Sequence, residues 1–252
     1  MSSKLADLSP LARKLGAEAP LTEAQVAAIL ALPATVRQVD AGQDIVREGD
    51  MPSQACLLLD GLAARFKIAA DGARQIHSFH ISGDIPDLQS LQLARMDHSV
   101  SALRPSTLAL LPHYGLKDLI RAHPELGYLL WRETLIEGSI FREWMSNIGR
   151  RQALERVAHV LCELAVRFDV LGLLYDGVLP VRIPQVDIGD AQGLSVVHVN
   201  RVMKQLKAQR LVRMKGPLIQ ILDFKALADV GDFDPAYLHL HTLPEICTQR
   251  AA

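Results

Sequence analysis

The sequence predicts an α+β protein in which an N-terminal β-roll, a long central helix and a C-terminal winged helix-turn-helix follow one another along the chain. Three observations lead to this prediction. Residues 36–111 contain short β-like runs punctuated by glycines, and residues 125–150 form one helical stretch. Residues 183–222 have the layout of two short helices, a sharp turn and a small hairpin. The expected domains are residues 1–123, 124–150 and 151–252.

The roll is expected to follow an N-terminal arm or short helix in residues 1–20 and a helix in residues 21–32, for which Thr22 is the N-cap. A short helix in residues 116–122 ends this part of the chain. The β-like runs between these helices recur about every ten residues, which favours a small β-sandwich or roll. Strands are expected at residues 55–59, 63–69 and 74–80.

The long helix is expected to run from Glu125 to about Arg150, and a seam with alternating steps of three and four residues can be traced along it. Such a seam packs either into the core of its own chain or against a second copy. The seam consists of Leu130, Thr134, Glu137, Phe141, Trp144 and Ile148. A further helix in residues 152–168 and a strand-like connection in residues 175–183 lead into the helix-turn-helix.

Turn chemistry defines the helix-turn-helix. Pro184 suits the first turn of a helix, where its missing N–H costs nothing. Gly193 permits the positive φ of a sharp turn, and Ser195 is a good N-cap for the second helix. The expected buried residues of the first helix are Val186, Ile188 and Ala191, and those of the second are Val199, Val202 and Leu206.

The other face of the second helix has the position and the charge of a DNA-reading surface. It carries Val196, Val197, Asn200, Arg201 and Lys204. Residues 191–222 contain six Lys and Arg residues and no Asp or Glu, although the net charge of the whole chain is −1. Because phosphate attraction is local, this segregation indicates DNA binding, and a solvated basic helix without a partner is the alternative. A protein that binds DNA with two-fold symmetry needs two recognition helices one turn of DNA apart, which favours a homodimer on a palindromic operator.

Composition restricts the remaining possibilities. Three widely spaced cysteines, no secretory signal and no apolar run of about 18 residues favour a cytoplasmic protein without a disulfide framework or a membrane partner. The sequence has no Ser/His/Asp order, paired-carboxylate motif, phosphate-cradling glycine loop or zinc spacing, so an enzyme and a bound metal are not expected.

Residues 36–222 resemble the Crp/Fnr family of bacterial transcription regulators. The roll shares its glycine pattern, in which Gly42, Gly49-Asp50, Gly61, Gly72 and Gly83-Asp84 recur. The segment Leu194-Ser195-Val196-Val197-His198-Val199-Asn200-Arg201 is similar to the family's recognition helix. The resemblance implies a cyclic-nucleotide-binding-like roll, a dimerisation helix, duplex DNA as partner and RNA polymerase as a further partner.

Departures from the family pattern fall on the effector pocket. The family's Gly-Glu-Leu piece reads Ile85-Pro86-Asp87-Leu88 here, and its Arg-Ser pair reads His98-Ser99. Histidine lacks the planar, always charged fork with which arginine holds a phosphate. Phe141 and Arg142 match positions where cyclic-AMP-binding relatives present small hydroxyl residues. The expected pocket residues are therefore Asp87, His98, Ser99, Phe141 and Arg142, for an unknown small-molecule effector or for none.

Other inputs of the family do not fit the sequence. An iron–sulfur sensor needs four cysteine thiolates, and a haem ligand pair from His77 and His80 would point to opposite faces of a strand. No cofactor is therefore expected. Two alternatives stay open: a cyclic-nucleotide-responsive activator with a modified pocket, and an interaction protein that has lost DNA binding.

The resemblance also implies roles in base reading. Arg201 keeps the family's position and is expected to contact guanine O6 and N7, whereas Val197 stands where well-known relatives have glutamate and suits a thymine methyl group. Ser195, His198 and Gln185 are expected near phosphates, and Lys204 and Lys207 near flanking phosphates.

Overall fold

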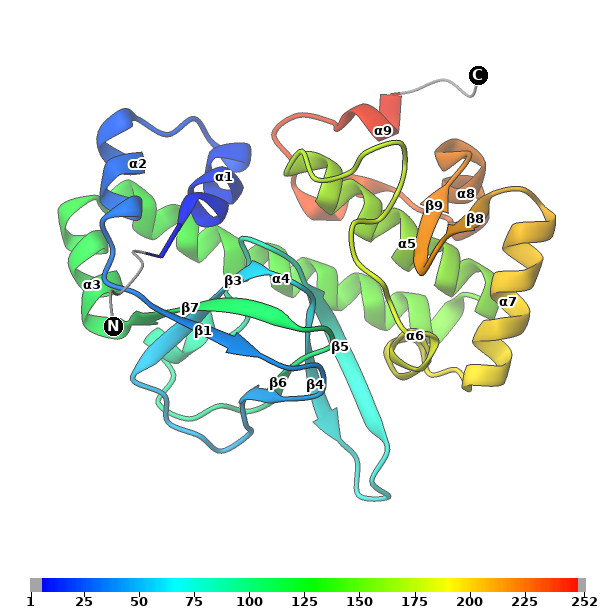
Figure 1. The fold of residues 1–252 in the computed structure, drawn as a ribbon, viewed down its shortest axis with the longest axis horizontal. Coiled ribbons are helices and arrows are strands. Elements are labelled where there is room, and N and C mark those ends of the chain that lie inside the picture. The colour runs from blue at the N-terminus through cyan, green and yellow to red at the C-terminus, as the bar shows by residue number, and fades with distance from the viewer. Residues whose placement is uncertain (1–5, 249–252) are drawn as a thin grey trace. The chain divides into compact units, whose positions relative to one another are not determined.

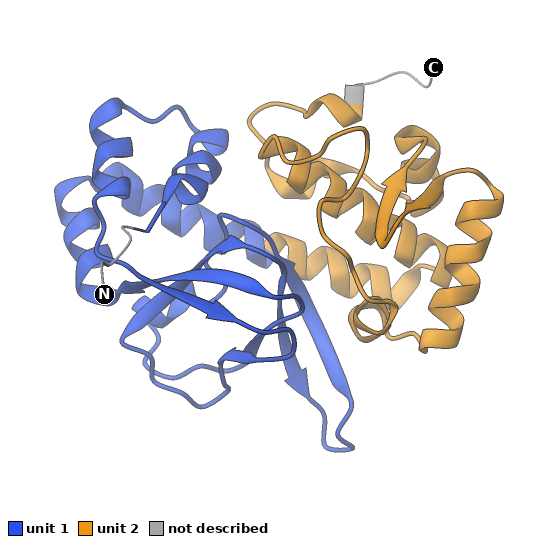
Figure 2. Ribbon diagram, in the orientation of Figure 1, with its two compact units in different colours: residues 1–138 blue, residues 139–252 orange. Residues whose placement is uncertain are grey.

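A computed structural model describes residues 6–248 of the chain, which divides into two compact units, residues 1–138 and 139–252 (Figure 2). The boundary falls within the long helix α4 (Pro124–Arg150). Residues 1–5, which belong to the predicted arm, and residues 249–252 lie outside the described residues. The predicted order of β-rich domain, long helix and helix-turn-helix with a hairpin wing is confirmed (Figure 1).

The first unit contains two antiparallel sheets that form the roll (Figure 1). One has three strands in the order β1-β7-β3, and the other has four in the order β2-β6-β4-β5. The three predicted strands correspond to β3, β4 and β5, with ends that differ by at most one residue. The strands are β1 (Thr35–Val39), β2 (Asp44–Val46), β3 (Gln54–Asp60), β4 (Ala63–Ile68), β5 (Arg74–His80), β6 (Ser99–Ala102) and β7 (Ser106–Pro112).

The alternation of side chains along β3 explains why the roll has two cores. Leu58 belongs to a cluster that also contains Val100 of β6, between the two sheets. Leu57 points to the other face of its sheet, where it joins a cluster with the helices of the same unit. Residues of both parities are buried on this strand, so it reads as a nearly continuous apolar run rather than as an alternating one.

Helices cover the second face of the three-stranded sheet. Leu11 and Leu15 of α1 and Leu126 of α4 belong to the same buried cluster as Leu57. The helix α2 starts with the predicted cap, because the Thr22 side chain accepts a hydrogen bond from the Gln25 N–H. The helices of this part are α1 (Ser9–Glu18), α2 (Glu23–Leu30) and α3 (His113–Ala122), with a 3-10 turn, η1 (Leu88–Leu91).

The seam predicted for α4 packs in part into the core of its own chain, which is the first of the two predicted alternatives. Leu130 is buried in the core of the first unit, and Trp144 is buried in the second, where its indole N–H donates to Glu163. Glu137 accepts a hydrogen bond from Arg65 of β4. These side chains serve the interior of their own units and are not available to a second copy. The apolar residues that α4 does expose are Tyr128, Trp131, Leu135, Phe141 and Met145.

The second unit is built around α5 (Ala153–Val170), whose middle is buried over consecutive turns. The predicted strand-like connection of residues 175–183 is reduced to isolated bridges, one of which joins Val178 to Gln220 of the wing. After the wing, one helix is followed by a 3-10 turn and a short helix. The remaining elements are α6 (Gln185–Gln192), α7 (Val196–Ala208), β8 (Val212–Lys215), β9 (Leu218–Ile221), α8 (Phe224–Gly231), η2 (Pro235–Leu238) and α9 (Glu245–Thr248).

Candidate nucleic-acid interface

The turn between α6 and α7 follows the predicted chemistry. Gly193 has φ +63°, in the left-handed region, and directly follows α6. The backbone of Leu194 donates to the Gly189 carbonyl at 2.9 Å, so the turn closes onto the preceding helix. A Cβ on Gly189 would lie 2.5 Å from the Leu194 carbonyl oxygen, which explains the need for glycine inside α6. Ser195 then caps α7 by accepting the His198 N–H at 3.2 Å.

The buried faces of the two helices agree with the sequence at all but one position. Ile188 and Ala191 of α6 are buried, whereas Val186 is 45% exposed and was wrongly predicted to be in the core. Asp187 takes a buried place instead, because at about 100° per residue it shares a face with Ile188 and Ala191, whereas position 186 lies about 200° from position 188. In α7 the buried residues are Val199, Val202, Met203 and Leu206.

The predicted reading face of α7 is open to solvent. Val197 is 81% exposed, and Val196, Asn200, Arg201 and Lys204 are also exposed. The Asn200 Nδ2 donates to the Gln185 Oε1 at 3.2 Å, so these two side chains lie side by side at the N-terminal end of the reading face. His198 is half-buried beside its cap. Because Val197 is exposed on a helix whose opposite face is buried in the core, it has no packing role within the described chain.

The cations of α7 are unneutralised. Within residues 6–248, Arg201, Lys204 and Lys207 are exposed and form no ion pair with a carboxylate. In the wing, Lys215 lies 3.5 Å from Asp176, whereas Arg213 donates to the neutral Gln220 side chain at 2.7 Å and keeps its charge. The unpaired positive charge on the exposed face of α7 is therefore available to a phosphate.

Three of the predicted effector residues, Asp87, His98 and Ser99, belong to the first unit. Asp87 is buried and its Oδ1 accepts the Cys56 N–H of β3 at 2.8 Å. Burial raises the pKa of Asp87 to about 6, although the hydrogen bonds from Cys56 act in the opposite direction. An open cavity of about 320 Å³ is lined by Asp87 and Cys56 together with Arg37 and Asp50. His98 and Ser99 do not line that cavity.

His98 is held as a neutral imidazole. Its Nδ1 is hydrogen-bonded to Asp97 at 2.7 Å, and its Nε2 is hydrogen-bonded to the Gln89 amide at 3.0 Å. Burial, and then the nearby charge of Arg65, lower the pKa of His98 to about 4. The neighbouring Ser99 Oγ accepts the Glu48 N–H at 3.0 Å. Neither side chain presents a positive charge to an anion at neutral pH.

The remaining effector candidates belong to the second unit. Phe141 and Arg142 lie on the exposed side of α4, within residues 139–252. Sequence reasoning missed Arg65 of β4, a part-buried cation of the roll that donates to the Pro86 carbonyl at 2.5 Å and to Glu137 at 2.9 Å. The available signal was a basic residue between the apolar Ala64 and Phe66 of β4.

The two shifted groups predict opposing pH effects on unfolding. Asp87 has a folded pKa above its unfolded value, so its contribution to stability falls as pH rises from about 4 to 6. His98 has a folded pKa below its unfolded value, so its contribution falls as pH drops from about 6.5 to 4. Within this window the two effects largely cancel in the native chain.

Asp87→Asn is expected to remove the first effect. The free energy of unfolding of the variant is expected to exceed that of the native chain by up to about 3 kcal/mol at pH 7. The reason is that the variant does not have to bury an ionised carboxylate, a cost that corresponds to the rise in the pKa of Asp87 from 3.8 to about 6. It gains little at pH 4, where the native carboxyl is already protonated. Urea unfolding between pH 4 and 7.5 measures this difference in the free energy of unfolding. For His98→Gln, the gain over the native chain should instead increase as the pH falls. A gain from Asp87→Asn that is independent of pH would contradict the burial of a titrating Asp87.

Among the described residues, no group of three or more His, Cys, Asp and Glu side chains is arranged to hold a metal ion. No helix in residues 6–248 is both long and apolar enough to span a membrane.

Comparisons with known proteins match both parts of the chain. The Crp-like helix-turn-helix domain matches residues 155–230, and the cyclic nucleotide-binding domain matches residues 36–123. A probable transcriptional activator of Rhizobium leguminosarum bv. viciae is 28% identical over 183 residues, which cover 71% of this chain and 74% of that protein. The fumarate and nitrate reduction regulatory protein of Vibrio cholerae is 24% identical over 195 residues, which cover 77% of this chain and 78% of that protein.

A solved structure has the same arrangement of elements. FixK2 from Bradyrhizobium japonicum superposes with a TM-score of 0.71 at 26% sequence identity, over 79% of this chain and 98% of that chain. With the reading face of α7 and the roll of the first unit, these matches identify the protein class. The chain belongs to the Crp/Fnr family of DNA-binding transcription regulators, which are not enzymes, and has a cyclic nucleotide-binding domain followed by a Crp-like helix-turn-helix domain.

Proposed function

We propose that this protein is a homodimeric regulator that reads a palindromic operator with α7, and that its roll is a degenerate cyclic-nucleotide domain. The observation that carries the proposal is the reading face of α7. There, the exposed Val197, Asn200 and Arg201 stand on a helix whose other face is fully packed. A helix with this division of faces suits the major groove, and its N-terminal residues then lie nearest the base edges.

Each residue of the face suits a particular contact. Arg201 has the planar fork that pairs with guanine O6 and N7, and Val197 offers an apolar surface to a thymine methyl group. Asn200 offers both a donor and an acceptor to adenine. Gln185, Ser195 and His198 lie at the start of the two helices and are assigned to phosphates, as is Lys204 farther along α7. Val196, also exposed, extends the apolar part of the face.

A second copy of the chain is the proposed occupant of the exposed stripe on α4. Tyr128, Trp131, Leu135 and Met145 are each more than half exposed. With Gly138 and Arg142, they follow one another in alternating steps of three and four residues, which is the repeat of a two-helix seam. An apolar row of this length in contact with water favours association. The homodimer places two α7 helices on one duplex.

The contacts within the roll support a degenerate pocket. Ordinary cyclic nucleotides carry a phosphate, for which the neutral His98 offers no charge. Ser99 already accepts a hydrogen bond from the backbone of Glu48, and Asp87 would repel an anion when ionised. A small molecule that binds Phe141 or Arg142 of α4 would act by favouring one arrangement of the two reading helices. RNA polymerase is a further proposed partner, as for an activator of transcription.

Selection of bound sequences from a random DNA pool tests the proposal directly. The expected product is a pair of inverted half-sites whose centres lie one helical turn, about 34–36 Å, apart. Binding to the selected site is expected to weaken steeply with salt, since α7 neutralises several phosphates. Enrichment of a single unpaired motif would contradict the two-fold reading, and no enrichment at all would favour an interaction protein.

Calorimetric titration with cyclic AMP and cyclic GMP separates the degenerate roll from a nucleotide-responsive one. We expect no heat of binding to the native chain for either nucleotide. Binding of either nucleotide, with a loss of binding in His98→Ala, would favour the alternative of a cyclic-nucleotide-responsive activator with a modified pocket. The His98→Arg variant is the matched test, because it restores the charged fork at the position of the family's arginine.

A further inference from the structure

A buried hydrogen bond joins the end of α4 to the turn of the helix-turn-helix. The Asn147 side chain is fully buried near the C-terminal end of α4, and its Nδ2 donates to the Gln192 Oε1 at 2.7 Å. Gln192 is also fully buried, and it is the last residue of α6. Hydrogen bonds between buried amides are costly to leave unmade, so this contact strongly restricts where the end of α6 can lie.

A second contact holds the same residue through its backbone. Arg156, in the first turn of α5, donates from Nη1 to the Gln192 carbonyl at 3.1 Å and from Nε to the Arg151 carbonyl at 2.7 Å. Asn147 also donates to the Arg156 carbonyl at 3.3 Å. Gln192 is therefore tied to the α4–α5 joint by its side chain and by its main chain. The residue that follows it, Gly193, makes the turn into α7.

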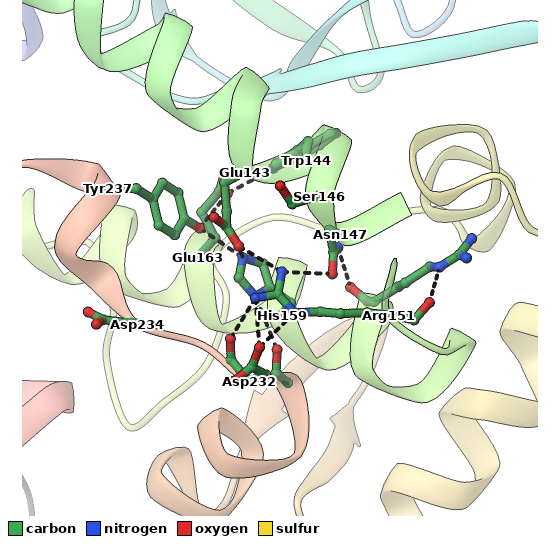
Figure 3. Close-up of polar contacts among 12 residues, drawn as sticks. Glu143, Trp144, Ser146, Asn147, Arg151, His159, Glu163, Asp232, Asp234 and Tyr237 are labelled. Carbon is green, nitrogen blue, oxygen red and sulfur yellow. Dashed lines mark hydrogen bonds and ion pairs between the residues drawn. The ribbon is translucent and has the colours of Figure 1, made fainter. Parts of the chain in front are cut away.

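The other end of this network is fixed by the segment after α8. Arg151 donates to Glu143 of α4 at 2.7 Å and to the carbonyl and carboxylate of Asp232 at 2.9 and 3.0 Å (Figure 3). The Tyr237 hydroxyl donates to the buried Glu163 of α5 at 2.8 Å. Asp232 and Tyr237 lie beyond residue 230, where the match to the helix-turn-helix family ends. The chain thus adds its own support to the joint.

We propose that Asn147 and Gln192 are positioning residues for DNA recognition, which fix the direction of α7 relative to the C-terminal half of α4. This inference rests on the proposed homodimer. When two copies pair along α4, the direction of α7 from that helix determines the distance between the two reading faces. Because a duplex accepts both faces only near one helical turn of separation, a loosened turn would tolerate operators of several spacings.

The spacing of two half-sites is therefore the readout, and Gln192→Met is the main variant. Methionine keeps the length and volume of the side chain and removes the acceptor for Asn147. Operators with identical half-sites and spacers that differ by one base pair are compared by gel shift. The native protein is expected to prefer one spacer about tenfold over its neighbours, and Gln192→Met less than about threefold. Its best affinity should change little, because the reading face is intact. Gln209→Met, at an exposed glutamine after α7, is the matched control and should keep the native preference.

A double-variant comparison attributes the effect to the Asn147–Gln192 bond. Asn147→Leu combined with Gln192→Met should relax the spacing no further than either change alone, since both remove the same contact. The exchange of Asn147→Gln with Gln192→Asn preserves the amide pair and the combined side-chain length, and it should restore much of the native preference. If Asn147→Leu fails to fold in a thermal unfolding assay, Gln192→Met and the exchanged pair carry the test.

Two results would overturn the inference. A Gln192→Met protein that folds and retains the native order of spacers would mean that the bond does not position α7. An equal loss of affinity on every spacer and on a single half-site would indicate a contribution to stability alone. If the native protein ignores the pairing of half-sites, the proposed dimeric reading fails, and the positioning role fails with it. The spacer preference of the native protein therefore distinguishes failure of the proposed dimer from failure of the positioning role.

Discussion

Leu135→Glu is expected to convert the protein to monomers and to remove its affinity for a palindromic operator. Leu135 is 55% exposed in the single chain and lies in the middle of the apolar row on α4. In a two-helix seam, the two introduced carboxylates would face each other without water, and such burial of like charges is strongly unfavourable. We expect the dimer dissociation constant to rise by at least about 100-fold, equivalent to about 3 kcal/mol.

Sedimentation velocity and a gel shift on the selected operator measure the two effects together. Leu93→Glu is the matched control, because Leu93 is 56% exposed in the first unit and lies outside the row on α4. That variant should remain dimeric and bind DNA normally. Native-like dimers of Leu135→Glu would place the dimer interface on another surface and would contradict the role proposed for α4.

Arg201→Ala is expected to weaken binding by about 1–3 kcal/mol per half-site, which is about 5- to 150-fold for each of the two half-sites, and to relax selectivity at one base pair of each. The physical reason is the bidentate contact, which only the arginine fork makes with guanine O6 and N7. Arg201 is exposed and has no acidic partner in residues 6–248, so its removal should leave the fold intact. Affinity on all single-base variants of one half-site measures the change.

Lys207→Ala provides the comparison for a phosphate contact on the same helix. It should weaken binding to all sequences alike and reduce the slope of log affinity against log salt by about one. If Arg201→Ala behaved in this way, with equal losses on operator and random DNA, Arg201 would contact only the backbone. The base assignment would then be wrong, although DNA binding by α7 would stand.

The local features of the fold could be predicted from single residues. Thr22 and Ser195 cap their helices as expected, and Gly193 takes the left-handed conformation. In α7, helical periodicity separates the buried Val199 from the exposed Val197. These predictions succeed because capping, turn conformation and amphipathic spacing depend on neighbours within a few residues.

Errors arose where the choice between two faces depends on distant residues. On α4, a row through Leu130 and Trp144 and a row through Leu135 both have the spacing of a packed seam. In the first row, Leu130 is buried because the helices of the first unit cover it, and Trp144 is buried where its indole binds Glu163 of α5. Nothing in the sequence of α4 itself distinguishes these rows.

By itself, the sequence determined the order of roll, long helix and helix-turn-helix, and the residues that α7 exposes opposite its packed face, since these follow from local periodicity and turn chemistry. Only the tertiary structure decided which side of α4 remains open, that His98 is neutral, and that Asn147 meets Gln192. The physical reason is that burial and hydrogen-bond partners are set by residues tens of positions away. Exposure and pKa follow from those partners rather than from the spacing of the residues along the chain.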